Sequence, residues 1–364
     1  MSRIVSVRCA IVSVPIRRAI RGPIVTLESI ENVVVRVDTD DGAVGWSYVY
    51  FPDRSRAEVV KRMVEDLRGE AIGEDPGRYQ YVWAKMWNRS NFLGQRGVTL
   101  FGIAAIDMAI WDVFCKEIGQ PLYRLLGGYR ERVPCYSSEL LEADSSSTAV
   151  ELAREAEALV RAGYRGLKLR LGVRPLSEDI ERVAAVREAV GPGVELMADA
   201  GQRWTLQQAL RMVRDLASFN LAWLEDPVPQ EQVDDLARVA EASGIPIASG
   251  HNDFGRYSFR RLIEMRAIDI LLFDIARVGG ITEFLRIAAL AAVYDVPMSS
   301  HVYPDVSIHL MAAAPTGLSC EHIEGWQPPS RVTMQPVDGY ASPSTQPGIG
   351  LDFDLDAPSF KDLN

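Results

Sequence analysis

Ionisable side chains recur at the ends of short apolar segments in the second half of this 364-residue chain. Two carboxylates on neighbouring strands are suitable ligands for a hard divalent cation such as Mg²⁺. A histidine that is hydrogen-bonded to a buried aspartate is oriented to act as a general base. A set of this kind could remove a proton α to a carboxylate and stabilise the resulting enediolate. The members of the set are Lys168, Arg170, Asp199, Glu225, His251, Asp274, His301 and Glu321.

Each of these residues also has an ordinary structural explanation when it is taken alone. An aspartate at the end of a strand is usually a helix cap, and a lone histidine is usually a hydrogen-bonded structural residue. His309 and His322 are treated as such structural histidines. The repetition of apolar segments that each end on an ionisable residue favours a shared functional site.

The elements that carry these residues alternate between apolar segments and amphipathic helical patterns such as TAVELAREAEALVRAG. This alternation predicts parallel strands joined by helical crossovers. The apolar segments span residues 133–138, 166–171, 194–199, 221–226, 245–250, 268–274 and 296–300, with a possible eighth at 318–321. Their number favours a barrel over a doubly wound sheet, which would usually carry a glycine-rich turn where Ser137-Ser138-Glu139 stands. In a barrel, the carboxyl ends of the strands converge on one mouth.

The first part of the chain has a different pattern. Residues 1–50 predict strands, including a hairpin at Thr39-Asp40-Asp41-Gly42, and residues 97–119 predict a long amphipathic helix that ends at Gly119. We therefore expect an α+β domain over residues 1–125 and a barrel over 126–325. The segment 326–364, rich in proline and glycine, is expected to pack back on the first domain.

The overall composition limits the kinds of partner. The net charge of −10 argues against a nucleic-acid-binding face. The cysteines are isolated, which favours a reduced compartment. We find no signal peptide and no run of about 18 apolar residues. A cytoplasmic enzyme for a small carboxylate substrate, without membrane or nucleic-acid partners, is the expectation.

The chain closely resembles the mandelate racemase branch of the enolase superfamily (the mandelate racemase/muconate lactonizing enzyme family). The resemblance covers nearly the whole sequence and is most specific in AAIDMAIWDVFCKEIGQPLYRLLGG (104–128) and SSHVYPDVSIHLMAAAP (299–315). It extends to GLKLRLG (166–172), MADAGQRW (197–204), WLEDP (223–227) and FDIARVGGIT (273–282). It implies an α/β fold, a modified TIM barrel of the (β/α)7β type with an N-terminal α+β capping domain. It also implies one bound Mg²⁺ and a homo-oligomer.

The resemblance also implies roles for individual residues. Asp199 and Glu225 match the first two metal ligands, and His301 with Asp274 matches a catalytic dyad. Glu321 matches an acid that hydrogen-bonds the substrate carboxylate, and Lys168 matches the first lysine of a Lys-x-Lys motif that also contacts it.

Two positions depart from the pattern of the family. Arg170 replaces the second lysine of the motif, and because arginine keeps its proton it is a poor base. His251 occupies the third metal-ligand position, which is normally a carboxylate. Imidazole is softer than Mg²⁺ prefers, so another divalent metal is an alternative, as are Asn252 or Asp253 reaching the ion.

These departures favour a reaction with one base. His301 would remove the α proton and a β-hydroxyl would leave, which is dehydration of a sugar acid to a 2-keto-3-deoxy acid. The leaving-group acid is unassigned, because Gly201 stands where one dehydratase branch has histidine. The alternatives are a racemase or epimerase of a 2-hydroxy acid and a non-catalytic or metal-free relative that only binds ligand.

The contacts to the rest of the substrate are predicted from three segments. A loop near Ile20–Ile24 should cover the mouth, where Arg21 could meet a distal polar group. Tyr50, in a second capping segment, and Ser138, at the end of the first barrel strand, are further candidates for substrate binding.

Overall fold

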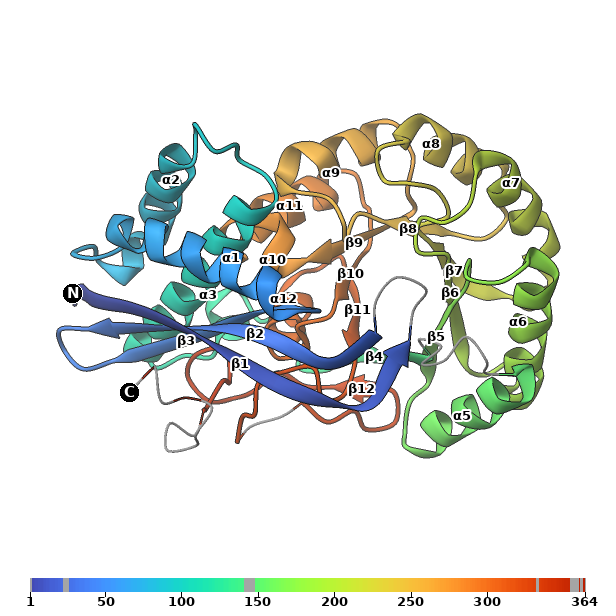
Figure 1. The fold of residues 1–364 in the computed structure, drawn as a ribbon, viewed down its shortest axis with the longest axis horizontal. Helices are drawn as coiled ribbons and strands as arrows, with labels where there is room; N and C mark the ends of the chain where they lie inside the picture. The colour runs from blue at the N-terminus through green and yellow to red at the C-terminus, as the bar shows by residue number, and fades with distance from the viewer. Residues whose placement is uncertain are drawn as a thin grey trace.

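The computed structural model describes residues 2–21, 26–140, 148–331, 334–353, 360 and 363. Figure 1 shows a long antiparallel sheet with helices on one side and, beside it, a ring of strands enclosed by helices. The chain begins in the sheet and returns to it after completing the ring.

The N-terminal part is an α+β domain. Its sheet has the order β1 (Ile4–Arg21), β2 (Thr26–Thr39) and β3 (Val44–Phe51), all antiparallel. Helices α1 (Arg54–Leu67), α2 (Tyr79–Arg89) and α3 (Val98–Ile118) pack beside it. At Gly45 of β3, a Cβ atom would lie 2.1 Å from the carbonyl oxygen of Ala109 in α3. Glycine is therefore required where this strand and this helix meet.

Helix α3 is the core helix of this domain. It is long and apolar enough to span a membrane, but 83% of its most apolar window is buried inside the protein. It ends, as the sequence predicts, at Gly119, which has a left-handed φ of 70°.

The larger part is a closed barrel of eight parallel strands, which confirms the predicted fold class and excludes the doubly wound sheet. Each strand pairs with the next, and β11 pairs with β4 through Cys320 opposite Cys135. The strands are β4 (Val133–Leu140), β5 (Gly166–Arg170), β6 (Glu195–Asp199), β7 (Leu221–Glu225), β8 (Ile247–Ser249), β9 (Ile270–Asp274), β10 (Met298–His301) and β11 (Gly317–His322).

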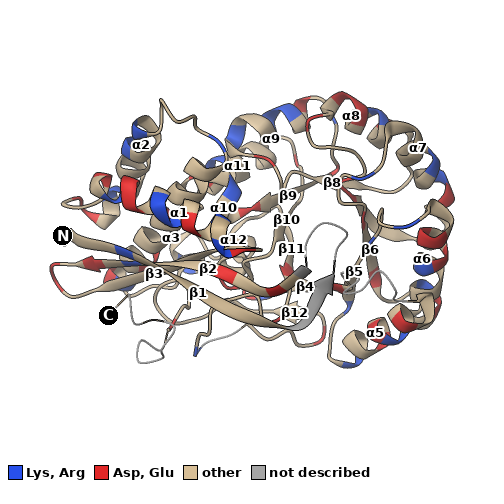
Figure 2. Ribbon diagram, viewed as in Figure 1, with Lys and Arg blue, Asp and Glu red and all other residues tan. Residues whose placement is uncertain are grey.

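Helices surround this barrel. They are α5 (Ala149–Arg161), α6 (Leu176–Val190), α7 (Leu206–Asp215), α8 (Val233–Ala242), α9 (Gly255–Glu264), α10 (Ile275–Val278), α11 (Ile281–Val293) and α12 (Pro304–Ala313). Acidic and basic residues are interspersed along the outer helices in Figure 2. This mixture is typical of solvated helix faces.

The interior of the barrel is a separate apolar cluster below the mouth. It consists of Tyr136, Met197, Trp223, Ala248, Ile270 and Leu272. The rings of Tyr136 and Trp223 meet edge to face, with centroids 5.3 Å apart. These side chains fill the barrel, so ligands can enter only from its end.

The C-terminal segment contacts the capping domain at several points. The amide of Ile349 donates to Asp112 of α3 at 2.8 Å, and Phe353 packs on Trp46 with centroids 5.5 Å apart. The short strand β12 (Tyr340–Ala341) pairs with β4. The exact boundaries at residues 125 and 325 stay predictions.

Asp107 joins the capping domain to the barrel. Its carboxylate in α3 accepts hydrogen bonds from the amide and the hydroxyl of Thr282 at the start of α11. Burial, opposed by these hydrogen bonds, raises the pKa of Asp107 from 3.8 to about 7. The folded protein therefore binds more protons here than the unfolded chain between these two pH values.

The stability contributed by this group should consequently fall as the pH rises through that window. Asp107→Asn keeps an acceptor for Thr282 but cannot ionise. We expect the melting temperature of the variant, relative to that of the wild type, to rise as the pH rises from about 4 to 7. Parallel melting temperatures over this range would contradict the expectation.

Candidate active site

The register of the barrel places the predicted residues at one level of the mouth. Arg170 pairs with Asp199, Asp199 with Glu225, and His301 with Asp274 on adjacent strands. Parallel strands in register present their last residues side by side. The alternation of apolar segments and polar ends in the sequence therefore corresponds to a ring of ionisable groups.

Sharp turns follow several of these strand ends. Gln202, Asp226, Val302 and Tyr303 all have left-handed backbone angles, with φ values of 64°, 43°, 45° and 49°. This conformation is unfavourable for a β-branched residue such as Val302. The turn directs the amide of Val302 at Oε2 of Glu321, at 2.7 Å. A strained backbone thus fixes a carboxylate of the site next to His301.

His301 and Asp274 form the predicted dyad. Nδ1 of His301 lies 2.9 Å from Oδ2 of Asp274. The other oxygen, Oδ1, accepts from the amides of Ala276 at 2.9 Å and Arg277 at 3.0 Å. Asp274 is therefore both a helix cap and an orienting group. This bond leaves Nε2 of His301 as the nitrogen available to a ligand in the pocket that His301 lines.

Lys168 lies between two buried carboxylates. Its Nζ atom is 2.9 Å and 3.0 Å from the two oxygens of Glu225 and 2.7 Å from Oε1 of Glu321. Burial alone would raise the pKa of Glu321, but Lys168, His301 and a hydrogen bond from Ser138 lower it to about 2. Glu321 is therefore ionised, and an ionised carboxylate accepts hydrogen bonds but cannot donate one. The donor role that the resemblance implies requires Glu321 to gain a proton when substrate arrives.

Arg170 is paired with Asp199. The distance from Nη1 of Arg170 to Oδ2 of Asp199 is 2.9 Å. Burial, which lowers the pKa of Arg170, is outweighed by Asp199 and the other carboxylates, so the net effect raises it. Arg170 remains a cation and cannot serve as an opposing base.

His251 stacks on His301, with ring centroids 4.2 Å apart and an interplanar angle of 16°. Its Nε2 atom lies 2.9 Å from Nδ2 of Asn252, while Nδ1 faces Oε1 of Glu225 at 3.5 Å. Burial, and next the neighbouring His301, lowers the pKa of His251 well below its usual value. A neutral imidazole is the form that binds metal ions.

Asn252, Asp226 and Arg277 hold this part of the site in place. Arg277 donates to the carbonyl oxygen of His251 and to Oδ1 of Asn252, both at 2.8 Å. Nδ2 of Asn252 donates to Oδ2 of Asp226 at 2.9 Å. Because arginine only donates and a carboxylate only accepts, these two partners determine which way the amide of Asn252 points.

The donor set matches a divalent cation in type. Asp199 and Glu225 end two consecutive strands and His251 follows the next one, and Nδ1 of His251 is a buried atom without a hydrogen-bond partner. In the described part of the chain, however, no three His, Cys, Asp or Glu side chains converge on one point. The carboxylates contact Lys168 and Arg170 instead. The residues fit the ion chemically, and Glu225 would have to release Lys168 to share in its coordination.

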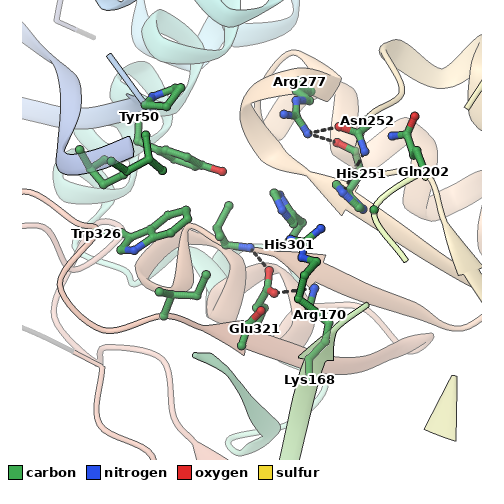
Figure 3. A pocket seen from close by; sticks show the side chains of 17 residues that line it. Tyr50, Lys168, Arg170, Gln202, His251, Asn252, Arg277, His301, Glu321 and Trp326 are labelled. Carbon is green, nitrogen blue, oxygen red and sulfur yellow. Dashed lines mark hydrogen bonds and ion pairs between the residues drawn. The ribbon is translucent and has the colours of Figure 1, made fainter. Parts of the chain in front are cut away.

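Lys168, Arg170, His251, His301 and Glu321 line a cavity of about 370 Å³ at the mouth of the barrel, whereas Asp199, Glu225 and Asp274 are not among its lining residues. Figure 3 shows the dyad histidine, Glu321, Lys168 and Arg170 on one side, with Tyr50 and Trp326 facing them. Tyr50 and Ser138 line the cavity, whereas the side chain of Arg21 and residues 22–24 lie outside the described residues. Asp253 is not among the lining residues, but Asn252 is.

Sequence reasoning missed the apolar residues of the lining and three that carry polar side-chain groups, Gln202, Arg277 and Trp326. Arg277 follows Asp274 by three positions, so the first turn after a strand could have pointed to it. Trp326 lies in a segment without periodicity, and no pattern in the sequence marks it.

The comparisons with known proteins agree with this geometry. Residues 4–127 match the N-terminal domain of mandelate racemase/muconate lactonizing enzyme, and residues 151–357 match the enolase C-terminal domain-like family. The chain is 32% identical over 327 residues to 3,6-anhydro-alpha-L-galactonate cycloisomerase of Streptomyces coelicolor, covering 90% of each protein. It is 32% identical over 329 residues to L-talarate/galactarate dehydratase of Salmonella typhimurium, covering 89% of this chain and 81% of that protein.

A solved structure extends the likeness to the whole fold. L-talarate dehydratase from Polaromonas sp. JS666, crystallised with Mg and L-glucarate, superposes with a TM-score of 0.92 at 32% identity. The match covers 97% of this chain and 96% of that one. These relatives are lyases and isomerases, which confirms the predicted enzyme class. The chain belongs to the mandelate racemase/muconate lactonizing enzyme family of the enolase superfamily.

Proposed function

We propose that this protein is a Mg²⁺-dependent dehydratase that converts a sugar acid to a 2-keto-3-deoxy acid. The observation that carries the proposal is the His301–Asp274 dyad in the same cavity as the Lys168–Glu321 ion pair. A base and a cationic carboxylate-binding group are thus held together in one pocket. The talarate/galactarate dehydratases among the relatives support the same reaction class.

The reaction begins with the substrate carboxylate at Lys168. Nε2 of His301 takes the α proton, and Asp274 stabilises the imidazolium that forms. Asp199, Glu225 and His251 would hold the Mg²⁺, which when bound would supply positive charge that stabilises an enediolate. His301 then returns its proton to the β-hydroxyl, which leaves as water. The enol product tautomerises to the 2-keto acid, so protons and atoms balance with a single base.

The charged state of Arg170 argues against racemisation by two opposed bases, because a group that holds its proton cannot accept one from substrate.

We propose further that the enzyme works in the cytoplasm as a homo-oligomer, without nucleic-acid or membrane partners. The acidic net charge of −10 supports the exclusion of nucleic acid.

A library of sugar acids incubated with enzyme and Mg²⁺ tests the reaction. Dehydration gives a 2-keto product that semicarbazide detects. Epimerisation conserves mass and changes only the optical rotation. Deuterium exchange at the α carbon without a keto product would exclude dehydration, and neither exchange nor product with any acid would favour a binding protein.

Replacement of His251 tests the metal site separately. His251→Glu adds the third carboxylate that the family usually has, and more ligand charge should tighten Mg²⁺ binding by about tenfold. Isothermal titration calorimetry with MgCl₂ measures the change directly. Gln202→Glu, which adds a carboxylate elsewhere in the pocket lining, is the matched control for charge alone. Equal affinities of wild type and His251→Glu would show that position 251 does not face the ion.

A further inference from the structure

The hydrogen bonds around His251 determine which of its two ring nitrogens carries the hydrogen. Nε2 of His251 lies 2.9 Å from Nδ2 of Asn252, so one of these two nitrogens must donate to the other. An amide nitrogen only donates, whereas one ring nitrogen of a neutral histidine can accept. As long as the amide of Asn252 keeps this orientation, Nε2 of His251 therefore holds a lone pair and no hydrogen.

Two charged neighbours fix the orientation of the Asn252 amide. Nη1 of Arg277 donates to Oδ1 of Asn252 at 2.8 Å, and Nδ2 of Asn252 donates to Oδ2 of Asp226 at 2.9 Å. The reversed amide would place its NH₂ group against the guanidinium and its oxygen against the carboxylate, so that two hydrogen bonds would become two repulsive contacts. Figure 3 shows Arg277 joined both to Asn252 and to the main chain of His251.

The remaining hydrogen of the His251 ring consequently lies on Nδ1. A neutral imidazole carries one hydrogen, and Nε2 is the nitrogen that accepts. Nδ1 is buried without a hydrogen-bond partner and faces Oε1 of Glu225 at 3.5 Å. His251 therefore presents an N–H group, and no lone pair, to the space beside Glu225.

A cation shared by Glu225 and His251 would need the opposite tautomer. A ligating ring nitrogen supplies its lone pair, and the second nitrogen of a metal-bound histidine normally donates to a carboxylate, a carbonyl oxygen or water. In this protein the second nitrogen faces an amide NH₂ group, which cannot accept. Coordination through Nδ1 therefore requires the hydrogen to move to Nε2 and the amide of Asn252 to give up its bonds to Arg277 and Asp226.

On the basis of the proposed function, in which a divalent cation binds at this site, we infer that Asn252 is a positioning residue that opposes coordination of the cation by His251. Arg277 and Asp226 hold the amide, and the amide keeps the hydrogen of His251 on Nδ1. The affinity of the site for a metal ion is lowered as a result. Asn252 acts through His251 and does not itself contact the ion.

The tautomer can be measured in the metal-free enzyme. Nitrogen-15 NMR of protein labelled in its histidine rings distinguishes a nitrogen that carries a hydrogen from one that holds a lone pair, and the signals missing from His251→Ala identify His251. We expect the hydrogen on Nδ1 in the wild type and on Nε2 in Asn252→Asp, because a carboxylate accepts where the amide donates. A hydrogen on Nε2 in the wild type, or an unchanged tautomer in Asn252→Asp, would overturn the inference.

Metal affinity provides a second readout. Asn252→Asp should bind Zn²⁺, for which imidazole is a suitable ligand, about tenfold to a hundredfold more tightly than the wild type in calorimetric titrations with ZnCl₂. Gln202→Glu is the matched control, because Nε2 of Gln202 also donates to Oδ2 of Asp226, at 3.2 Å. This control adds the same charge and should gain less affinity than Asn252→Asp. An equal gain would assign the effect to charge and contradict the inference.

The double variant His251→Ala/Asn252→Asp separates coordination by His251 from coordination by the introduced carboxylate. The gain in Zn²⁺ affinity should disappear when this variant is compared with His251→Ala alone. A gain that persists without the imidazole would show that residue 252 binds the ion directly, which would also overturn the inference.

Failure of the proposed function would be a distinct result. If the wild type binds no Mg²⁺, the metal-dependent reaction is excluded, but a gain of Zn²⁺ binding in Asn252→Asp would still support the inference. Binding of Mg²⁺ by the wild type together with no gain of Zn²⁺ affinity in Asn252→Asp would leave the proposed function intact and overturn the inference.

Discussion

His301→Asn is expected to lower kcat by roughly 10²- to 10⁴-fold, because the amide cannot accept the α proton. The substitution should leave the site otherwise intact, since asparagine is smaller than histidine and can still donate to Asp274. Ligand binding should therefore change little. Exchange of the α hydrogen with deuterium, followed by NMR in D₂O, reports the proton transfer even where no product accumulates.

Asp274→Asn is the companion variant for this prediction. It removes the charge that orients His301 and stabilises the imidazolium, so it should reduce both exchange and turnover while the base itself remains. The decrease in exchange and turnover in Asp274→Asn should be substantial and no greater than that in His301→Asn. Exchange in His301→Asn within tenfold of the wild-type rate would assign the base to another residue.

Lys168→Met is expected to lower the free energy of unfolding by about 3–5 kcal/mol. Lys168 is 3% exposed and is the shared cation of Glu225 and Glu321, so the variant would leave two buried carboxylates without it. Urea unfolding measures the loss. Lys61→Met is the control, because Lys61 and Glu65 form a partly exposed pair within α1 and its removal should cost less than about 1 kcal/mol.

The pH dependence of this loss has a definite sign. In the wild type, the pKa of Glu321 is lowered from 4.5 to about 2, so its contribution to stability is complete above pH 4.5 and is lost as the pH falls through 2. Without Lys168, burial raises that pKa instead. The deficit of Lys168→Met should therefore be larger at pH 8 than at pH 4.5. A deficit independent of pH would show that the lost packing of the lysine stem, and not its charge, explains the effect.

The barrel and the positions of the ionisable residues at its mouth follow from local patterns. Apolar segments of five to seven residues with an ionisable residue at or just after their end indicate both a buried strand and its polar end, so the residues at 199, 225, 274 and 301 could be placed without coordinates. The hairpin near Gly42 and the helix end at Gly119 were predictable for the same reason, because turn and cap chemistry is local.

The contacts that these ionisable residues make with one another could not be predicted in this way. Sequence reasoning gave Lys168 no partner within the protein, and the structure shows it bound to Glu225 and Glu321. The stacking of His251 on His301 likewise depends on the direction of two side chains from strands that are not adjacent. Such contacts are decided by rotamers and packing, which periodicity does not encode.

The contact between Trp326 and the capping sheet was even less predictable from local patterns. Asn32 and Trp326 are separated by 294 positions, and their hydrogen bond forms only when the C-terminal segment reaches the capping sheet. That segment has no helical or strand periodicity, so its path depends on tertiary contacts. The specificity of the pocket is consequently harder to read from sequence than its chemistry.

The left-handed backbone at Val302 also limits how this enzyme could be improved. A residue of this type in that conformation costs roughly 1–3 kcal/mol, which glycine would relieve. Glycine would also widen the range of conformations open to the loop and loosen the amide that holds Glu321 beside His301. Selection for thermal tolerance and selection for turnover would therefore favour different residues at this one position.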